Sequence, residues 1–294
     1  MQSISIIGMG RLGGALALAL SRAGYRVENL IHRSKPAPSD LASLISPPPH
    51  LISFDDLKEL SSDIIFITSA DPEISSISSH IALKVKNNSL VFHASGSLSS
   101  EILSDLANVG CGTGSMHPLV SISDPIRGSE RFAGAYFCVE GQNNAVAVGK
   151  EIVTNLGGEP FSIDTRFKSL YHASAVTASG HLVALIDIAT EMLSNCGLEP
   201  EEAKRILMPL VKSTVENLQN QSNEKALTGT FARADVAAFE RHIDALSHTV
   251  SDDIRRIYLE LGNRALDISE VEEASSENAQ KIRDGIKLAL QTGK

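Results

Sequence analysis

The sequence predicts two domains: an α/β domain with a doubly wound, mostly parallel sheet over residues 1–164, and an all-α domain over residues 165–294. The first half alternates short runs rich in β-branched residues with helical stretches, which is typical of parallel strands joined by helices. The second half contains long stretches with helical periodicity and few β-branched runs. A chain of 294 residues is also long enough for two domains.

Short apolar runs predict the strands of the first domain, and stretches with helical spacing lie between them. The segment Ser34–His50 is rich in serine and proline, which predicts a surface loop. The predicted strands are Ser3–Gly8, Arg26–His32, Asp63–Ser69, Ser89–His93, Gly112–Met116 and Ala135–Val139. The predicted helices are Arg11–Ala23, Pro72–Lys86 and Ser99–Asn108.

Long helices fill the predicted second domain. Gly197 and Gly262 follow two of them, and glycine often ends a helix because it adopts positive φ without strain. The acidic residues after Pro200 suit a helix N-terminus. The predicted helices are Phe167–Cys196, Pro200–Gln219, Asp235–Leu261 and Ser275–Leu290.

Composition argues against several classes of protein. The chain has 26 Lys and Arg against 35 Asp and Glu, a formal net charge of −9, which disfavours nucleic-acid binding. Only 4% of the residues are aromatic, so stacking platforms for bases are not expected.

The three cysteines, Cys111, Cys138 and Cys196, are far apart in sequence, and we expect them to be buried free thiols. His242 and His248 lack metal-ligand spacing, and we expect no metal site.

The N-terminal residues and the hydropathy pattern predict a cytoplasmic protein. No Lys or Arg precedes Arg11, so the positively charged start of a signal peptide is not expected. We identify no apolar run of about 18 residues, the length that a membrane-spanning helix needs. We therefore expect no membrane association.

A glycine-rich turn between the first predicted strand and the first predicted helix carries the clearest chemical signal. Its glycines allow a tight turn and close approach of the backbone to a pyrophosphate, and the helix N-terminus supplies N–H donors. A second strand follows at the expected distance, so the pattern predicts a dinucleotide-binding (Rossmann) domain. A tight turn without a ligand is the alternative. The residues expected to contact the cofactor here are Gly8, Met9, Gly10, Arg11, Leu12 and Gly13.

The residues after the second predicted strand favour NADP over NAD. An NAD site usually has Asp or Glu there, which binds the ribose 2′-OH. This chain has His32, Arg33 and Ser34, which supply a guanidinium and a hydroxyl for a 2′-phosphate. Glu28 lies too early in the strand to reach the ribose. A solvated basic loop is the alternative.

Ligands of doubly wound sheets bind beyond the carboxyl ends of the strands. Ser69 and Ala70 are small enough to let the nicotinamide ribose approach. His93 and Ser95 either face the nicotinamide or cap the next helix. His117 has either a substrate or proton-transfer role or a role in loop hydrogen bonding.

Several motifs resemble the Rossmann-like proteins with a DUF2520 C-terminal domain, through almost the whole chain. That family is provisionally described as NADP-binding oxidoreductases. It is similar to pyrroline-5-carboxylate reductase, to the deazaflavin-dependent NADP reductases and to dehydrogenases with a 6-phosphogluconate-dehydrogenase-like C-terminal domain. The resemblance implies NADP as the cofactor and a homodimer formed through the helical domain. The motifs are the glycine loop, His93–Gly96, Gly114–Leu119, Leu170–Val176, Leu227–Gly229, Arg233, Asp235 and His242.

Three polar residues share one face of the first predicted helix of the second domain. At about 100° per residue, Lys168, His172 and Ser179 fall within about 40° of one another. The related dehydrogenases place a Lys, and an Asn four residues later, against the nicotinamide, and Lys168 and His172 have that spacing. Hydride transfer to a C=O or C=N carbon needs a nearby proton donor, which His or Lys can be. A satisfied interdomain His and a solvated Lys are the alternatives.

Arg233 precedes a helix that Asp235 is expected to cap. It is a candidate to anchor a substrate carboxylate through a bidentate contact, and an ion pair across a dimer interface is the alternative. The chain departs from the family pattern at Gly180, Thr230 and Ala234, where Asn, Pro and Gly are usual.

The sequence therefore predicts an NADP-dependent oxidoreductase that transfers hydride between nicotinamide and a small polar carbonyl, imine or hydroxy acid. One alternative is a non-catalytic NADP-binding sensor or interaction protein, which the three departures favour. A second is an enzyme similar to ketopantoate or pyrroline-5-carboxylate reductase. Against it, His172 stands where an Asn is expected four residues after a catalytic Lys.

Overall fold

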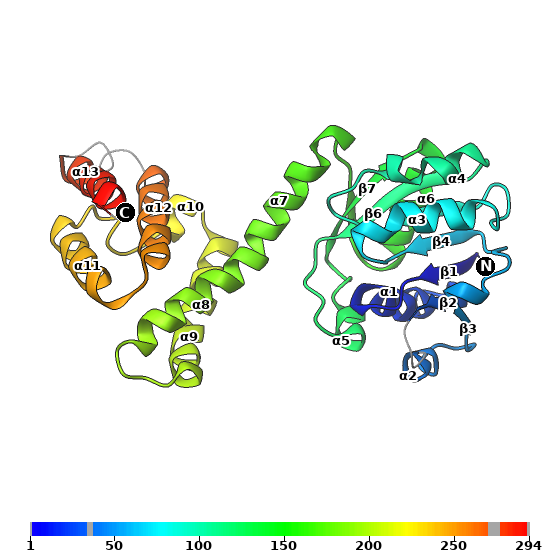
Figure 1. Ribbon diagram of the computed structural model, residues 1–294, viewed down its shortest axis with the longest axis horizontal. Helices are drawn as coiled ribbons and strands as arrows, with labels where there is room; N and C mark the ends of the chain where they lie inside the picture. Colours follow the sequence, from blue (N-terminus) through cyan, green and yellow to red (C-terminus); the bar gives the residue numbers. More distant parts are fainter. Residues whose placement is uncertain (1, 34–37, 270–276, 293–294) are drawn as a thin grey trace. The chain divides into compact units, whose positions relative to one another are not determined.

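The computed structural model describes residues 2–33, 38–269 and 277–292. The chain divides into two compact units, Met1–Ser179 and Gly180–Lys294. Figure 1 shows a sheet with its surrounding helices in the first unit and a set of helices in the second. The predicted fold class, a Rossmann-like α/β part followed by a helical part, is confirmed.

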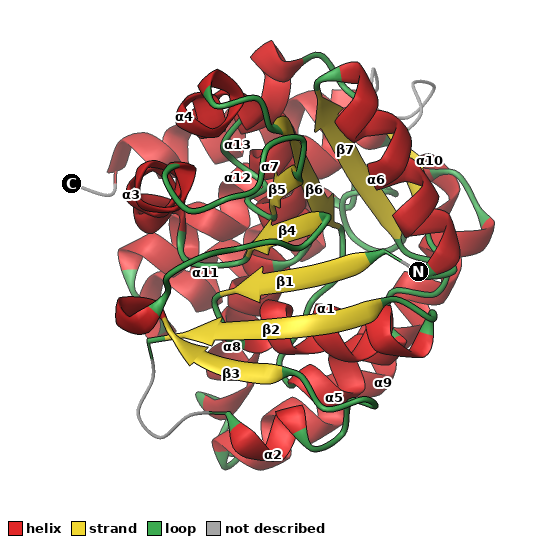
Figure 2. Cartoon of the chain, turned by 90° about the vertical axis from the view of Figure 1, so that its right-hand side faces the viewer, coloured by secondary structure: helices red, strands yellow, loops and turns green. Residues whose placement is uncertain are grey.

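An eight-stranded sheet forms the centre of the first unit, in the order β3-β2-β1-β4-β5-β6-β7-β8 (Figure 2). All neighbouring strands are parallel except β6 and β7, which are antiparallel. Strand order runs outward from the β1–β4 pair in both directions, which is the doubly wound pattern. The strands are β1 (Ser3–Ile7), β2 (Arg26–His32), β3 (His50–Ser53), β4 (Ile64–Ile67), β5 (Leu90–His93), β6 (Gly112–Pro118), β7 (Tyr136–Gly141) and β8 (Glu159–Phe161).

Two hydrophobic clusters pack on the sheet because successive strand residues point to opposite faces. In β4, Ile64 and Phe66 join the cluster that includes α1 and α6, while Ile65 and Ile67 join the one that includes α3 and α4. The helices of this unit are α1 (Arg11–Arg22), α2 (Ser39–Ala42), α3 (Asp71–Ala82), α4 (Ser104–Asn108), α5 (Pro125–Glu130), α6 (Asn143–Asn155) and α7 (Lys168–Ala178). Single 3₁₀ turns occupy Phe54–Asp56, Ser100–Leu103 and Thr165–Phe167.

The predicted elements of the first unit are present, and four further ones were missed. The strands β3 and β8 have four and three residues and no fully buried one, so neither forms the apolar run that marks the central strands. The helices α5 and α6 were also missed. The predicted loop Ser34–His50 contains the one-turn helix α2, and the predicted helix Ser99–Asn108 is a 3₁₀ turn followed by α4.

Helices make up the second unit, and its hydrophobic core lies among α11, α12 and α13. Two long predicted helices are each split in the structure. Phe167–Cys196 becomes α7 and α8, with Ser179 as the C-cap of α7, and Asp235–Leu261 becomes α11 and α12, with Ser251 extended before α12. The helices are α8 (Gly180–Ser194), α9 (Pro200–Asn220), α10 (Asn223–Ala226), α11 (Val236–Thr249), α12 (Asp252–Ile268) and α13 (Glu277–Thr292).

Three smaller expectations were wrong. Gly262 does not end a helix but lies inside α12, where an added Cβ would come within 2.4 Å of the Phe231 ring. Cys196 is exposed, unlike Cys111 and Cys138, which are buried. The stretch Thr165–Ser194 contains an 18-residue window with a mean hydropathy of 1.3, which makes it long and apolar enough to cross a membrane by length and composition alone. Core helices of soluble proteins pass the same test.

Two glycines in the turn from β1 to α1 are required by the packing and backbone conformation of the turn, whether or not a ligand binds. Gly8 has φ 101°, and a Cβ there would lie 2.7 Å from the backbone nitrogen of Ser69. A Cβ on Gly13 would lie 2.0 Å from the Gly8 carbonyl oxygen. Gly10 differs, because an added Cβ would meet nothing within 4 Å.

We expect Gly13→Ala to lower the free energy of unfolding by about 3 kcal/mol or more, because the methyl group would overlap backbone that cannot move aside. Gly10→Ala is the matched control, and its loss should be about 1 kcal/mol or less, the cost of a poorer N-cap residue. Urea denaturation of both variants measures the difference. Equal losses would contradict this account of the turn.

Candidate functional site

The predicted site residues of the first unit follow the carboxyl ends of adjacent parallel strands. In spatial order these strands are β2, β1, β4, β5 and β6, so their carboxyl ends share one edge of the sheet. Arg33 follows β2, Gly8 follows β1, Ser69 follows β4, Ser95 follows β5, and His117 lies near the end of β6. An extended ligand on this edge would pass all five positions in that order.

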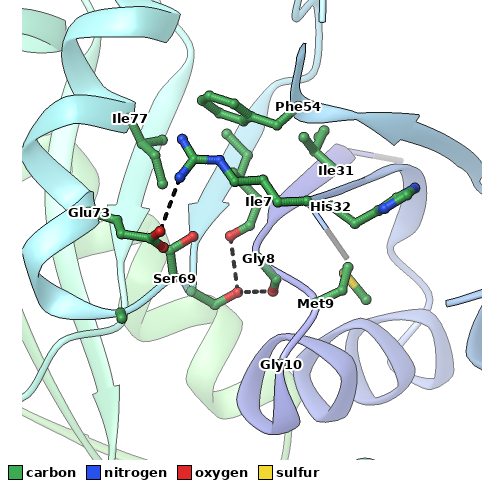
Figure 3. A pocket seen from close by; sticks show the side chains of 13 residues that line it. Ile7, Gly8, Met9, Gly10, Ile31, His32, Phe54, Ser69, Glu73 and Ile77 are labelled. Carbon is green, nitrogen blue, oxygen red and sulfur yellow. Dashed lines mark hydrogen bonds and ion pairs between the residues drawn. The ribbon is translucent and has the colours of Figure 1, made fainter. Parts of the chain in front are cut away.

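A pocket of about 350 Å³ lies beside the glycine turn (Figure 3). Seven of the residues predicted to contact the cofactor line it: Gly8, Met9, Gly10, His32, Arg33, Ser69 and Ala70. Arg11, Leu12 and Gly13 form the first turn of α1 instead. Ser34 lies outside the described residues. Phe54, Glu73 and Ile77 also line the pocket and were not predicted.

The glycine turn fits a bound pyrophosphate. The N-cap residue of α1 is Gly10, no side chain caps the helix, and its first turn contains no acidic residue. The first N–H groups of a helix need partners, and the helix dipole favours an anion there. The Thr68 hydroxyl donates to the Gly8 carbonyl oxygen at 2.6 Å and fixes the turn. Since neither packing nor φ requires glycine at Gly10, the open space there suits a ligand that approaches the backbone closely.

Arg33 and Glu73 form an ion pair in the lining of this pocket. The Arg33 guanidinium donates to the Glu73 carboxylate, with Nη1 3.0 Å from Oε1, and its Cζ lies 4.4 Å from the centre of the Phe54 ring. Both charged side chains are about half exposed, at 48% and 44%. The predicted cation is therefore in the pocket, and it already has an anionic partner.

A second group of polar residues converges on Gly96, in the loop after β5. The Nδ1 atom of His117 lies 2.7 Å from the Tyr171 hydroxyl. A Cβ on Gly96 would lie 2.4 Å from Nδ1 of His172 and 2.8 Å from Nε2 of His117. Among the described residues, the buried Nδ1 of His172 has no hydrogen-bond partner. Both imidazole rings thus lie against the backbone of Gly96, where any side chain would overlap them, so packing requires glycine at this position.

Two of these groups, His117 and Tyr171, are neutral at neutral pH. Burial, together with the nearby positive charge of Lys168, lowers the pKa of His117 to about 4. Burial raises the pKa of Tyr171 well above 10, so its hydroxyl keeps its proton. A neutral His117 that accepts the Tyr171 proton at Nδ1 carries its own proton on Nε2, the atom that faces Gly96.

A buried ion pair lies next to the two histidines. Lys168 and Glu140 are 2% and 3% exposed, and Nζ lies 3.6 Å from Oε1. Lys168 also donates to the Ser115 hydroxyl at 2.8 Å. Glu140 accepts from the Ser100 backbone N–H at 2.9 Å and from its hydroxyl at 2.7 Å. The pair fastens the first turn of α7 to β6 and β7, and His172 follows one turn later.

The other predicted site residues have different surroundings. His93 is fully buried, where Nδ1 accepts from the Ser95 N–H and Nε2 donates to the Ser99 carbonyl, and burial lowers its pKa to about 4. The Ser95 hydroxyl accepts from the backbone N–H groups of Ser97 and Leu98 in the same loop.

Ser179 is exposed at the end of α7. Arg233 is exposed in the second unit, before α11, and Asp235 caps that helix as expected. Among the described residues, no group of three His, Cys, Asp or Glu could hold a metal ion.

Four residues of the pocket, the histidine group and the buried ion pair were not predicted as site residues. For three of them the sequence contains a feature that could have indicated a role. Gly96 and Tyr171 belong to motifs that the family resemblance includes. Glu140 is the lone acid in the apolar run of β7, which indicates a buried partner. Glu73 had no signal, because its partner Arg33 is 40 residues away in sequence.

Two family models match the chain. Residues 1–118 match the Rossmann-like domain, and residues 135–265 match the domain of unknown function DUF2520. The predicted resemblance is confirmed. No functionally curated protein matches the sequence.

Solved structures with the same fold come from several organisms. A Bacteroides fragilis protein, provisionally described as an NADP oxidoreductase, has a TM-score of 0.73 at 20% identity, over 90% of this chain and 97% of that chain. A Thermotoga maritima protein has a TM-score of 0.70 at 24% identity, over 90% and 98% of the two chains. Plasmodium falciparum pyrroline carboxylate reductase with NADP bound has a TM-score of 0.54 at 15% identity, over 100% and 98%. At these identities the likeness shows the fold.

We expect Lys168→Met to lower the free energy of unfolding by about 3–5 kcal/mol, because it leaves the Glu140 carboxylate buried without its cation. The double variant Lys168→Met with Glu140→Gln should lose less than the single one. Lys212→Met is the matched control: its ion pair with Glu216 is exposed, so the loss should stay below about 1 kcal/mol. Urea denaturation measures all three. Similar losses for Lys168→Met and Lys212→Met would contradict a stabilising role for the buried pair.

Proposed function

We propose that this chain, a Rossmann-like domain followed by a DUF2520 domain, is an NADP-dependent oxidoreductase acting on a small polar carbonyl, imine or hydroxy acid. One observation carries the proposal. His117 and His172 lie together against Gly96, on the sheet edge that also carries the glycine turn, with ring centroids 5.8 Å apart. A polar substrate atom that reaches Nδ1 of His172 would satisfy this unpartnered group.

The pocket beside the glycine turn supports NADP as the cofactor. The uncapped N-terminus of α1 suits the pyrophosphate, and the Arg33 guanidinium suits a 2′-phosphate. Ser69 and Ala70 line the pocket on the side nearer to β5. The structure with NADP bound among the similar folds agrees with this choice.

The histidine group supports reduction of a polarised double bond. Bound NADPH supplies the hydride, which forms a new C–H bond at the carbonyl or imine carbon. The Nε2–H of a neutral His117 donates a hydrogen bond to the substrate oxygen or nitrogen and polarises it. The substrate atom would take its proton from water, because the Tyr171 hydroxyl, 2.7 Å from Nδ1, keeps its own proton and holds the neutral ring with its N–H on Nε2. Lys168 acts as a positioning residue, since it touches Ser115 and Glu140 inside the protein.

Binding and turnover can be tested separately. Titration with NADPH, followed by nicotinamide fluorescence, should show binding that Gly10→Ala weakens at least tenfold, because its methyl group would enter the space proposed for the pyrophosphate. His172→Ala should keep NADPH affinity within about twofold. In a panel of small carbonyls, imines and hydroxy acids that includes 1-pyrroline-5-carboxylate, it should lose at least 100-fold in kcat/KM.

The possible outcomes distinguish the alternatives. NADPH binding with turnover that His172→Ala removes supports the oxidoreductase. NADPH binding without turnover of any compound in the panel supports a sensor. Equal affinity of wild type and Gly10→Ala would contradict the pyrophosphate position.

We further propose that the helical unit forms a homodimer in the cytoplasm. The most apolar 18-residue window within Thr165–Ser194 contains no buried residue in the single chain. In the second unit, a groove of about 300 Å³ is lined mainly by apolar side chains of α8 and α12. Large apolar surfaces of this kind are commonly covered by another chain. A second copy is the occupant that the family resemblance implies. The exposed apolar side chains of α8 and α9 include Leu182, Val183, Leu185, Ile206, Met208, Leu210, Val215 and Leu218.

Sedimentation velocity at several protein concentrations tests this dimer. Val183 is 70% exposed in the single chain, so Val183→Asp should leave the fold intact yet weaken dimerisation at least tenfold, because the new carboxylate would be buried at the interface. Leu83→Asp is the control: Leu83 is 91% exposed in the first unit, and its replacement should not change the sedimentation. A wild-type monomer at all concentrations contradicts the proposal.

A further inference from the structure

We infer that Glu73 is a specificity-determining residue that lowers the preference of this site for NADPH over NADH, an inference that rests on the proposed function. The usual determinant of this preference is the residue at the end of the second strand, and here that position has no carboxylate. The structure supplies a carboxylate from a different element, the first turn of α3.

The geometry places this carboxylate in the cofactor pocket. Glu73 and Arg33 both line the pocket of about 350 Å³, and a dashed line from the labelled Glu73 marks their ion pair in Figure 3. The pair joins the end of β2 to α3, at 3.0 Å between Nη1 and Oε1. The Glu73 carboxylate thus occupies the guanidinium that a 2′-phosphate would need.

The two cofactors would meet this pair differently. A 2′-phosphate carries negative charge, so it must displace Glu73 from Arg33 and is also repelled by the carboxylate. The 2′-OH of NADH is a hydrogen-bond donor, and a carboxylate accepts from it, as acidic residues do in NAD sites. Glu73 therefore opposes NADPH and favours NADH, while Arg33 has the reverse effect.

The size of the effect follows from the exposure of the pair. Both side chains are about half exposed, and ion pairs of this kind are weak. A 2′-phosphate can therefore displace Glu73 at a moderate cost in affinity, about two- to fivefold. The Phe54 ring, 4.4 Å from the Arg33 guanidinium, supports that group from a second direction, so Arg33 keeps a contact in the pocket when Glu73 is changed.

The test compares the dissociation constants of NADPH and NADH for wild type, Glu73→Gln and Asp55→Asn by fluorescence titration. We expect Glu73→Gln to bind NADPH about two- to fivefold more tightly and NADH no more tightly, so that the ratio of the two constants shifts towards NADPH. Asp55→Asn is the matched control, because Asp55 is exposed beside Phe54, does not line the pocket, and its change removes the same charge. It should leave the ratio unchanged.

Arg33→Met provides an independent arm. It should weaken the binding of NADPH and not that of NADH. Glu73→Gln added to it should shift the ratio towards NADPH by less than Glu73→Gln does in wild type, since the cation for which Glu73 competes is gone and only direct repulsion and the contact with the 2′-OH remain. Glu73→Ala should shift the ratio in the same direction as Glu73→Gln.

Failure of the inference and failure of the proposed function give different results. If wild type binds NADPH and the ratio is the same in Glu73→Gln, or shifts equally in Asp55→Asn, the inference is overturned and the proposed function stands. If wild type binds neither cofactor, both are overturned.

Discussion

The arrangement of the histidine site depends on the buried ion pair between Lys168 and Glu140. Two charges removed from water are costly, and this pair persists because Ser115 and Ser100 hydrogen-bond to its members. The pair fixes the start of α7 against β6 and β7, whereas most of the later residues of that helix are exposed. His172 lies one helical turn after Lys168, so the same pair brings His172 next to His117.

Much of the fold could be predicted from sequence because its central strands are buried on both faces. All residues of β4 are fully buried, which makes the strand a short, uninterrupted apolar run. The two edge strands, β3 and β8, are partly exposed, so their sequences resemble loops. The break between α7 and α8 falls at Gly180, a signal that the helical spacing of the flanking residues outweighed. The break between α11 and α12 has no glycine or proline to mark it, and tertiary packing decides such breaks.

In the candidate site, too, the residues that lie close together in sequence could be predicted, and the contacts between residues distant in sequence could not. The glycine turn and Arg33 could be predicted because strand, turn and helix are contiguous in sequence. Ser179 was placed by the assumption of one continuous helix, which α7 does not satisfy. The partners Glu73 and Glu140 are brought to Arg33 and Lys168 by the folded sheet, and no sequence spacing indicates such contacts.

The antiparallel pairing of β6 with β7 crosses the boundary between the two family regions. The Rossmann-like region ends with β6, and the DUF2520 region begins just before β7, so neither region alone contains the complete sheet. A fragment ending at the boundary would leave the backbone of β6 as a bare sheet edge, open to pairing with other chains and to aggregation. A piece that keeps the complete sheet and the buried Lys168–Glu140 pair extends from β1 through α7, which is the extent of the first compact unit.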